Sequence, residues 1–279
     1  MSASATAQPA PPPAPFGRRL AAVTARERLG SYLVLSCLDG EGPLPRAGQF
    51  YMLASGARWG GGDGERPFLP RAFSALRGAV AGGGVELQFL VEDVGPGTRR
   101  LCELGPGEDL ALVGPLGTPF APPRAGRRPL LVGGGVGIAP LAILQDELGP
   151  PAHALLGFRD RRHAAGAALL RDPRVSTDDG SVGHAGRVTD LLLAELEVAA
   201  SELEVYACGP PRMLEAVRML CAEHETPAQL ALESGMACGF GACFGCVVPT
   251  REGYVRLCLE GPVLDSARLE TALVAGAAD

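Results

Sequence analysis

The sequence predicts two domains and an appendage: an antiparallel β-barrel, then an α/β domain with a parallel sheet, then a small cysteine-rich segment. Three observations predict this order. Short β-type runs separated by turn residues occupy residues 16–123, strands alternating with helices occupy 124–227, and four cysteines gather in 228–279. The chain has 279 residues, which is enough for this division, since domains usually contain about 100–150 residues.

The N-terminal region is predicted to be a barrel because its β-type runs are short and regularly interrupted by turns. The runs are Tyr32–Leu35, Gln49–Leu53, Ala72–Leu76, Val85–Val91 and Leu110–Val113. Glycine-rich patches at 60–64 and 78–84 lie between them. We interpret these patches as surface loops, with a role as a lid as the alternative. Residues 1–15, rich in Pro and Ala, are expected to be a disordered tail.

The second region is predicted to contain a parallel sheet because its strands alternate with helices. The strand candidates are Leu130–Val132, Ala154–Phe158 and Val205–Cys208, and the helix candidates are Pro140–Leu148, Thr189–Ala199 and Pro211–His224. A last strand, Gln229–Leu232, leads into the cysteine-rich segment.

Composition excludes several classes of partner. The net charge is −6, and no basic run or basic amphipathic helix is present, so we expect neither nucleic acid nor a membrane surface as a partner. The longest apolar stretches, such as 129–143, are interrupted by glycine and fall short of the roughly 20 residues of a spanning helix. The N-terminus lacks the features of a secretory signal. We therefore expect a cytoplasmic protein whose cysteines are reduced or metal-bound.

Four cysteines form the most specific pattern in the sequence. Cys238, Cys243 and Cys246 are separated by four and then two residues, and Cys258 follows after eleven more. This spacing is typical of the thiolates that bind a plant-type [2Fe-2S] cluster. The glycines between them let the backbone fold tightly and direct N–H groups at the sulfurs. The alternatives are a four-thiolate zinc site, which usually has two short cysteine pairs, and unligated thiols.

Two glycine-containing segments of the α/β region indicate a nucleotide site. Residues 129–140, PLLVGGGVGIAP, are predicted to form a buried strand, a glycine-rich turn and the start of a helix. Such a turn allows close approach of a pyrophosphate to backbone N–H groups. The spacing is not the Gly-x-Gly-x-x-Gly of the common dinucleotide fold. A second segment, Cys208–Met213, follows a strand and begins a helix.

Together these two segments resemble the ferredoxin–NADP reductase superfamily. The resemblance implies that the first segment holds the phosphates of a nicotinamide dinucleotide and that the second lies beside the nicotinamide ring. The residues concerned are Gly134, Gly135, Val136 and Gly137 in the first segment, and Cys208, Gly209 and Pro210 in the second.

The same resemblance predicts a flavin motif of Arg, two residues, then Ser or Thr, and Arg71-Ala72-Phe73-Ser74 matches it. It implies that Arg71 binds the FAD pyrophosphate, for which the guanidinium fork is suited. Ser74 is then expected at the reactive edge of the flavin, with Cys208 as the second catalytic residue. Further flavin contacts are expected at Leu90, Val91, Glu92, Gly97 and Thr98, although family members generally have Tyr and Arg at the positions of Val91 and Glu92.

The order of flavin barrel, nicotinamide domain and C-terminal cluster resembles the electron-transfer subunits of NAD-dependent dihydroorotate dehydrogenase. The motifs are RAFS at 71–74, GPGT at 95–98, VGPLGTPF at 113–120, VGGGVGIAP at 132–140, STDDGSVGHAG at 176–186, YACGPPRML at 206–214 and ESGMACGFGACFGC at 233–246. The resemblance implies an oxidoreductase subunit of pyrimidine biosynthesis. In this family, electrons pass from dihydroorotate oxidation on an FMN-containing catalytic subunit through [2Fe-2S] and FAD to NAD⁺, in a heterotetramer of two copies of each subunit.

Other functions stay open on the sequence alone. An NAD(P)H-dependent ferredoxin or sulfur-compound reductase, or the reductase component of an oxygenase, uses the same modules, and a zinc-stapled assembly module needs no flavin. The preference for NAD is open in the same way. Asp178 and Asp179 follow a strand, where they either repel the 2′-phosphate of NADP or are solvated turn residues.

Overall fold

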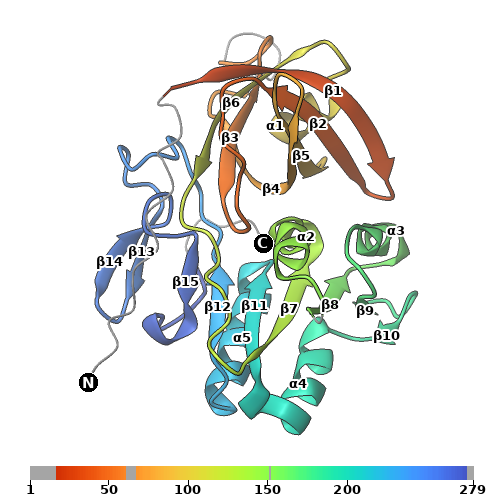
Figure 1. Ribbon diagram of the computed structural model, residues 1–279, viewed down its shortest axis with the longest axis vertical. Coiled ribbons are helices and arrows are strands. Elements are labelled where there is room, and N and C mark those ends of the chain that lie inside the picture. Colours follow the sequence, from red (N-terminus) through yellow and green to blue (C-terminus); the bar gives the residue numbers. More distant parts are fainter. Residues whose placement is uncertain (1–16, 61–66, 151, 275–279) are drawn as a thin grey trace.

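The structure is a computed structural model that describes residues 17–60, 67–150 and 152–274. In Figure 1 the barrel lies above the α/β domain, and the cysteine-rich segment lies beside both. The fold class predicted from the sequence is therefore confirmed. The predicted tail at 1–15 and most of the glycine-rich patch at 60–64 lie outside the described residues.

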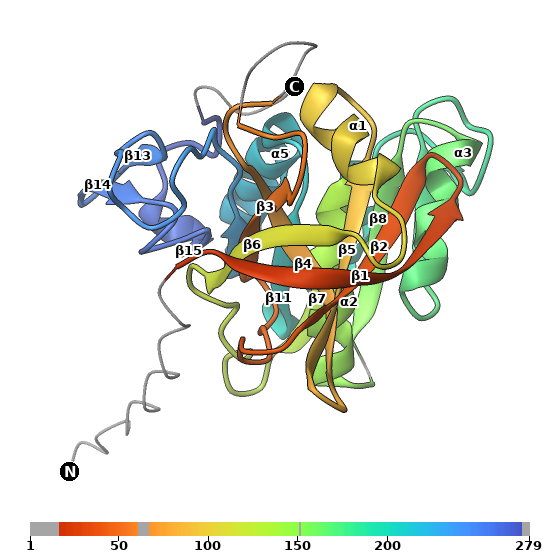
Figure 2. The same ribbon diagram turned by 90° about the horizontal axis from the view of Figure 1, so that it is seen from above.

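The barrel is closed by antiparallel strands in the order β1-β2-β5-β4-β3-β6, and Figure 2 looks down onto it. Its strands are β1 (Arg19–Leu29), β2 (Tyr32–Asp39), β3 (Phe50–Ser55), β4 (Arg71–Ala81), β5 (Gly84–Glu92) and β6 (Asp109–Leu116), with helix α1 (Pro96–Glu103) between the last two. All five predicted runs form strands. The sequence interpretation missed β1, which pairs with both β2 and β6 and so closes the barrel.

The second domain is a sheet in the order β10-β9-β8-β7-β11-β12-β15, parallel except for β15. Its strands are β7 (Arg128–Gly134), β8 (His153–Phe158), β9 (Arg174–Thr177), β10 (His184–Ala185), β11 (Leu203–Cys208), β12 (Ala228–Ala231) and β15 (Val263–Asp265). Its helices are α2 (Ala139–Leu148), α3 (Arg161–Ala164), α4 (Val188–Ala199) and α5 (Pro211–Glu223). The three predicted helices are confirmed within a residue at each end.

Two apolar clusters hold these parts together. One joins the barrel interior to α2 and the face of the sheet that α2 covers. The other joins the opposite face to α4, α5 and the cysteine-rich segment. Polar contacts reinforce the first junction, since Arg77 of β4 donates to the Leu169 carbonyl at 2.6 Å and the Ala47 N–H donates to Glu147 at 3.0 Å. The barrel and the sheet therefore present fixed walls to the space between them.

The topology places a ligand site between β7 and β11. The chain leaves β7 toward β8 on one side and returns with β11 on the other side. At such a switch point the connections leaving the carboxyl ends of two neighbouring parallel strands diverge and open a crevice. Both predicted nucleotide segments pass through this point, because β7 ends at Gly134 and β11 ends at Cys208.

The cysteine-rich segment begins at the sheet and returns to it. The strand predicted at 229–232 is β12, which lies inside the sheet between β11 and β15. Between β12 and β15 the chain forms the cysteine loop and a hairpin of β13 (Val247–Thr250) and β14 (Gly253–Arg256). No helix within the described residues is long and apolar enough to cross a membrane.

Candidate functional site

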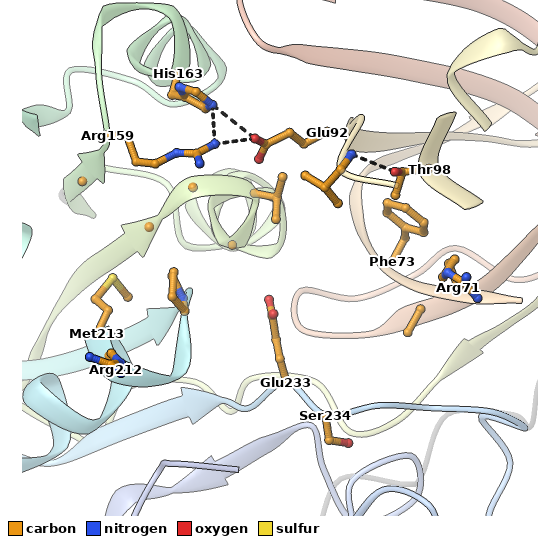
Figure 3. Close-up of a pocket in the computed structure, with 18 of the residues that line it drawn as sticks. Arg71, Phe73, Glu92, Thr98, Arg159, His163, Arg212, Met213, Glu233 and Ser234 are labelled. Atoms are coloured by element: carbon orange, nitrogen blue, oxygen red, sulfur yellow. Dashed lines mark hydrogen bonds and ion pairs between the residues drawn. The ribbon is translucent and has the colours of Figure 1, made fainter. Parts of the chain in front are cut away.

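A cleft of about 1260 Å³ lies between the barrel, the sheet and the cysteine-rich segment. It exceeds the roughly 300–1,000 Å³ of an ordinary small-molecule pocket, as a site for large cofactors requires. Figure 3 shows side chains from all three parts directed toward it. Ten of the predicted cofactor residues line it: Arg71, Ala72, Phe73, Glu92, Thr98, Gly134, Gly135, Val136, Gly137 and Pro210.

Six other predicted residues do not line the cleft: Ser74, Leu90, Val91, Gly97, Cys208 and Gly209. Their positions have simple causes. Leu90 and Val91 are buried in the apolar cluster that joins the barrel to the sheet domain, where they are 2% and 0% exposed. Cys208 is buried beneath the nucleotide loop. Ser74 is half-buried on β4, opposite Phe50 of β3.

The two predicted flavin motifs of the barrel meet in one corner of the cleft. A Cβ added at Gly97, in the first turn of α1, would lie 2.8 Å from Nε of Arg71. The Thr98 hydroxyl accepts hydrogen bonds from the N–H groups of Val94 and Gly95 at 2.9 and 3.0 Å, which fixes the turn before α1. A guanidinium beside a helix N-terminus is an anion site by both charge and hydrogen bonding. These residues therefore fit the pyrophosphate of a flavin dinucleotide.

The glycine loop after β7 is held tightly against the end of β11. A Cβ at Gly137 would lie 2.6 Å from both the Cys208 carbonyl oxygen and the Gly209 Cα, and one at Gly134 would lie 2.6 Å from the Met213 sulfur. Gly135 has φ +55°, which strongly favours glycine. The loop thus exposes bare backbone to the cleft, as close binding of phosphates requires.

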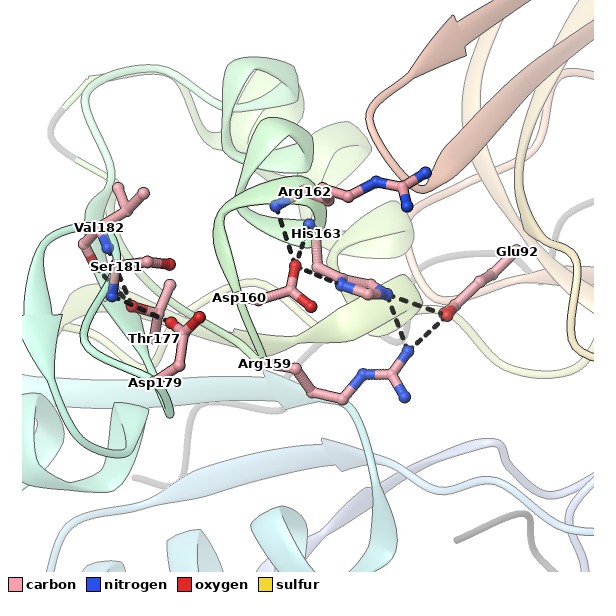
Figure 4. A network of polar contacts seen from close by, with 9 residues as sticks. All are labelled: Glu92, Arg159, Asp160, Arg162, His163, Thr177, Asp179, Ser181 and Val182. Atoms are coloured by element: carbon pink, nitrogen blue, oxygen red, sulfur yellow. Dashed lines mark hydrogen bonds and ion pairs between the residues drawn. The ribbon is translucent and has the colours of Figure 1, made fainter.

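A polar network crosses the rim of the cleft from the barrel to the sheet (Figure 4). Glu92 of β5 accepts a hydrogen bond from Arg159 at 2.7 Å and lies 3.2 Å from Nε2 of His163. Nδ1 of His163 lies 2.8 Å from Asp160, whose carboxylate also caps α3 by accepting from the Arg162 and His163 N–H groups. Glu92, which the resemblance led us to expect at the flavin, therefore bonds to the sheet domain.

Glu233 projects into the middle of the cleft from the segment that follows β12 (Figure 3). Burial raises the pKa of its carboxyl to about 7. Burial and then the nearby charge of Glu233 raise the pKa of the Cys208 thiol well above its ordinary value. Cys208 is therefore a neutral thiol beside a carboxyl that changes its charge near neutral pH.

Several cleft residues had no role in the sequence interpretation: Arg159, His163, Arg187, Arg212, Met213 and Glu233. The sequence could have indicated that most of them lie near the site, because they follow the carboxyl ends of predicted parallel strands or begin the next helix.

The acidic pair after β9 divides into two roles. Asp178 lines the cleft. Asp179 instead accepts from the Ser181 N–H at 2.9 Å, within the turn. Asp178 is therefore the residue of the pair that is placed to affect a bound nucleotide.

The four predicted cluster cysteines come together as two pairs. The sulfurs of Cys246 and Cys258 lie 3.3 Å apart, because the β13–β14 hairpin returns the chain to its starting point. Cys238 and Cys243 form a second hydrogen-bonded pair. Among the described residues, no three Cys, His, Asp or Glu side chains converge around a single metal position. Two pairs fit a two-iron cluster, which takes two thiolates on each iron, better than a tetrahedral zinc.

The surroundings of these sulfurs also fit a cluster. Burial opposes ionisation of Cys238, but N–H groups of Cys243, Phe240 and Ala242 direct hydrogen bonds at its sulfur and lower its pKa to about 7. Burial raises the pKa of Cys258, next to Cys246. As thiolates, Cys246 and Cys258 would repel each other at this distance, and a bound cluster would supply the positive charge that offsets the repulsion.

Comparisons with known proteins agree with this geometry. Residues 233–270 match the family model for the iron–sulfur cluster binding domain of dihydroorotate dehydrogenase B. The electron transfer subunit of NAD⁺-dependent dihydroorotate dehydrogenase B from Bacillus caldolyticus is 42% identical over 183 residues, which cover 61% of this chain and 68% of the relative. The same subunit from Caldanaerobacter subterraneus subsp. tengcongensis is 32% identical over 252 residues, covering 87% of this chain and 94% of the relative.

Solved structures support the fold. The structure of an NADH-dependent reduced ferredoxin-NADP oxidoreductase superposes with a TM-score of 0.75 at 23% identity, covering 92% of this chain and 91% of the other. The ferredoxin reductase of carbazole 1,9a-dioxygenase gives a TM-score of 0.60 at 25% identity, over 74% of this chain and 65% of the other. Since the similarity to the subunit from Caldanaerobacter extends over nearly the whole of both sequences, the chain belongs to the family of electron transfer subunits of NAD⁺-dependent dihydroorotate dehydrogenase B.

Proposed function

We propose that this chain carries electrons from dihydroorotate, oxidised on a separate catalytic subunit, to NAD⁺ through its [2Fe-2S] cluster and FAD. One observation supports this most strongly. Met236, Ala237 and Gly245 of the cysteine loop line the same cleft as Arg71 of the flavin corner and Gly137 of the nucleotide loop. The residues proposed to hold the cluster, the flavin and the nicotinamide are therefore neighbours around one space.

The three groups divide the work by their chemistry. A flavin takes electrons singly from an iron–sulfur cluster and gives them to nicotinamide as a pair, and this chemistry belongs to the cofactor. Arg71 and the start of α1 would hold the flavin phosphates, and Gly134–Gly137 would hold those of the nicotinamide dinucleotide. Pro210, just after β11, would flank the nicotinamide ring from the wall of the cleft. Cys208, at the buried end of β11, would lie beneath the ring, and Ser74 on β4 would act at the reactive edge of the flavin.

The outer side of the cluster loop supplies a surface for the catalytic partner. Cys243 is exposed, and around the cluster Phe240, Phe244 and Leu259 are 45%, 61% and 41% exposed. The Arg256 guanidinium lies 5.2 Å from the centre of the Phe244 ring. Aromatic residues and arginine are enriched in the cores of protein interfaces. We place the FMN-containing catalytic subunit on this surface, in an assembly of two copies of each subunit, as the family resemblance implies.

The nicotinamide acceptor is NAD⁺ rather than NADP⁺ in this proposal. Asp178 supports the choice, because a carboxylate in the cleft would repel a 2′-phosphate at short range. NAD⁺ is also the cofactor in the names of the two relatives from Bacillus caldolyticus and Caldanaerobacter.

Replacing one cluster cysteine tests the proposal. Cys243→Ser is expected to remove the cluster absorbance and electron exchange with the catalytic subunit, while FAD content and NADH-to-dye activity stay close to those of the unmodified chain. Cys102→Ser is the matched control, since Cys102 lies outside the cluster loop. Loss of flavin from Cys243→Ser alone, or a colourless unmodified chain after anaerobic purification, would contradict the proposal.

A further inference from the structure

Glu233 occupies the position in the cleft where the three parts of the molecule meet. It follows β12, whose Ala231 pairs with Cys208 at the end of β11. In Figure 3 its carboxyl points between Met213, on the nucleotide-loop side, and Phe73, on the barrel side. The electron route described above passes between these two sides.

The Glu233 carboxyl is the titratable group best placed to hold a proton there. Among the described residues it has no hydrogen-bond or ion-pair partner, and burial alone accounts for its raised pKa of about 7. Cys208 of β11 is the titratable neighbour that responds to its charge. The other titratable or charged residues that line the cleft are Tyr32, Arg71, Glu92, Arg159, His163, Asp178, Arg187 and Arg212.

Other titratable side chains in the described part of the cleft are less suited to carry this proton, because they are bonded to neighbours, buried or exposed at its edge. Glu92 and His163 are bound to each other and to Arg159 at the rim. Cys208 is a buried thiol whose pKa is raised well above its ordinary value. Asp178 is exposed at the end of β9. Glu233, which is half-buried, combines an unpaired carboxyl with a route to solvent.

The proposed reaction needs a proton that its electron source does not bring. The cluster delivers electrons only, one at a time, whereas the hydride that leaves for nicotinamide consists of two electrons and one proton. The balance for each turnover is NAD⁺ + 2 e⁻ + H⁺ → NADH. One proton must therefore enter the cleft for every pair of electrons.

We propose that Glu233 supplies this proton: its carboxyl gives a proton up inside the cleft as electrons arrive from the cluster, and solvent then restores it. The proposal rests on the electron route through the cluster and FAD. It also accounts for the side chain itself, since an unpaired carboxyl in a cleft would otherwise be a pure cost to folding. In the opposite direction a hydride from NADH carries its own proton, so Glu233 has no part in that transfer.

The test compares two ways of delivering electrons to the chain loaded with FAD and cluster. In anaerobic stopped-flow experiments with NADH, Glu233→Gln is expected to reduce the flavin within about threefold of the unmodified rate. With reduced methyl viologen as an electron-only donor and NAD⁺ as acceptor, the variant is expected to form NADH about 100-fold more slowly, as for loss of a general acid. Glu223→Gln, at an exposed position at the end of α5, is the matched control.

Two further measurements separate a proton carrier from a structural residue. The rate of viologen-driven NADH formation is expected to fall as the pH rises through about 7 in the unmodified chain, where Glu233 loses its proton, and to lose this step in Glu233→Gln. Glu233→Asp, which keeps a carboxyl, is expected to recover part of the rate and the pH step. The reduced-minus-oxidised infrared difference spectrum is expected to contain a carboxyl C=O band that Glu233→Gln lacks.

Equal slowing of both electron routes in Glu233→Gln, or no slowing of either, would overturn the role of Glu233. Failure of the underlying electron route is distinguishable. It would appear in the unmodified chain, as absence of flavin or as no NADH formed from reduced viologen.

Discussion

Replacing Glu233 with glutamine is expected to change how the stability of the flavin-free chain depends on pH. Burial raises the pKa of this carboxyl from 4.5 to about 7. Between these two pH values the folded chain holds one proton more than the unfolded chain, so its free energy of unfolding falls as the pH rises. Each pH unit changes that free energy by about 1.4 kcal/mol. The interval from 4.5 to about 7 therefore amounts to about 3 kcal/mol.

Urea denaturation at a series of pH values from 4.5 to 8 measures this effect. Glutamine does not titrate, so the variant is expected to match the unmodified chain near pH 4.5 and to exceed its free energy of unfolding by about 3 kcal/mol above pH 7. Glu223→Gln serves as the control, because its carboxyl is exposed. A difference between Glu233→Gln and the unmodified chain that stays constant across the series would refute the reasoning, since the carboxyl would then titrate alike in both states.

Three other substitutions test separate parts of the structure. Gly137→Ala places a methyl group 2.6 Å from the Cys208 carbonyl oxygen, which costs about 1–3 kcal/mol of strain. This strain is expected to weaken NADH binding about tenfold in fluorescence titrations and to leave the FAD content unchanged. Asp178→Asn removes a charge worth about 1 kcal/mol to a nearby phosphate, so the kcat/KM ratio of NADPH to NADH is expected to rise about fivefold; an unchanged ratio would count against Asp178 as the discriminating residue. Asp39→Ala deprives buried Arg19 of a carboxylate bound at 2.6 Å. It is expected to lower the free energy of unfolding, measured by urea denaturation, by about 3–5 kcal/mol. A loss below about 1 kcal/mol would show that the surroundings of Arg19 relax.

Much of the fold could be predicted from the sequence because most elements carry a clear local signal. The helices at 139–148, 188–199 and 211–223 lie within a residue of prediction at each end. β1 was missed because RLAAVTARERL is rich in alanine and charged residues, and only its first half alternates between buried and exposed positions. β15 was missed because it is three residues long and is fixed by pairing with β12 rather than by its own sequence.

The residues of the candidate site also differ in how far the sequence alone could predict them. The glycine loops and the cysteines could be found because their chemistry demands particular residues at fixed spacing. The strand ends could place Glu233 and Arg159 near the site, but no role could be assigned to either, because that role depends on which distant elements face them. Glu92 shows this most clearly: the sequence marked it as a departure from the family, and only the structure supplies its partners, Arg159 and His163.

The most direct test of the proposed function is NADH formation from dihydroorotate. The chain, purified anaerobically with FAD and cluster, is mixed with the proposed FMN-containing catalytic subunit, dihydroorotate and NAD⁺, and NADH is followed by absorbance. We expect NADH to form only when both subunits are present and to be lost when Cys243→Ser replaces the unmodified chain. NADH formation by the catalytic subunit alone, or an undiminished rate with Cys243→Ser, would contradict an electron route through this cluster.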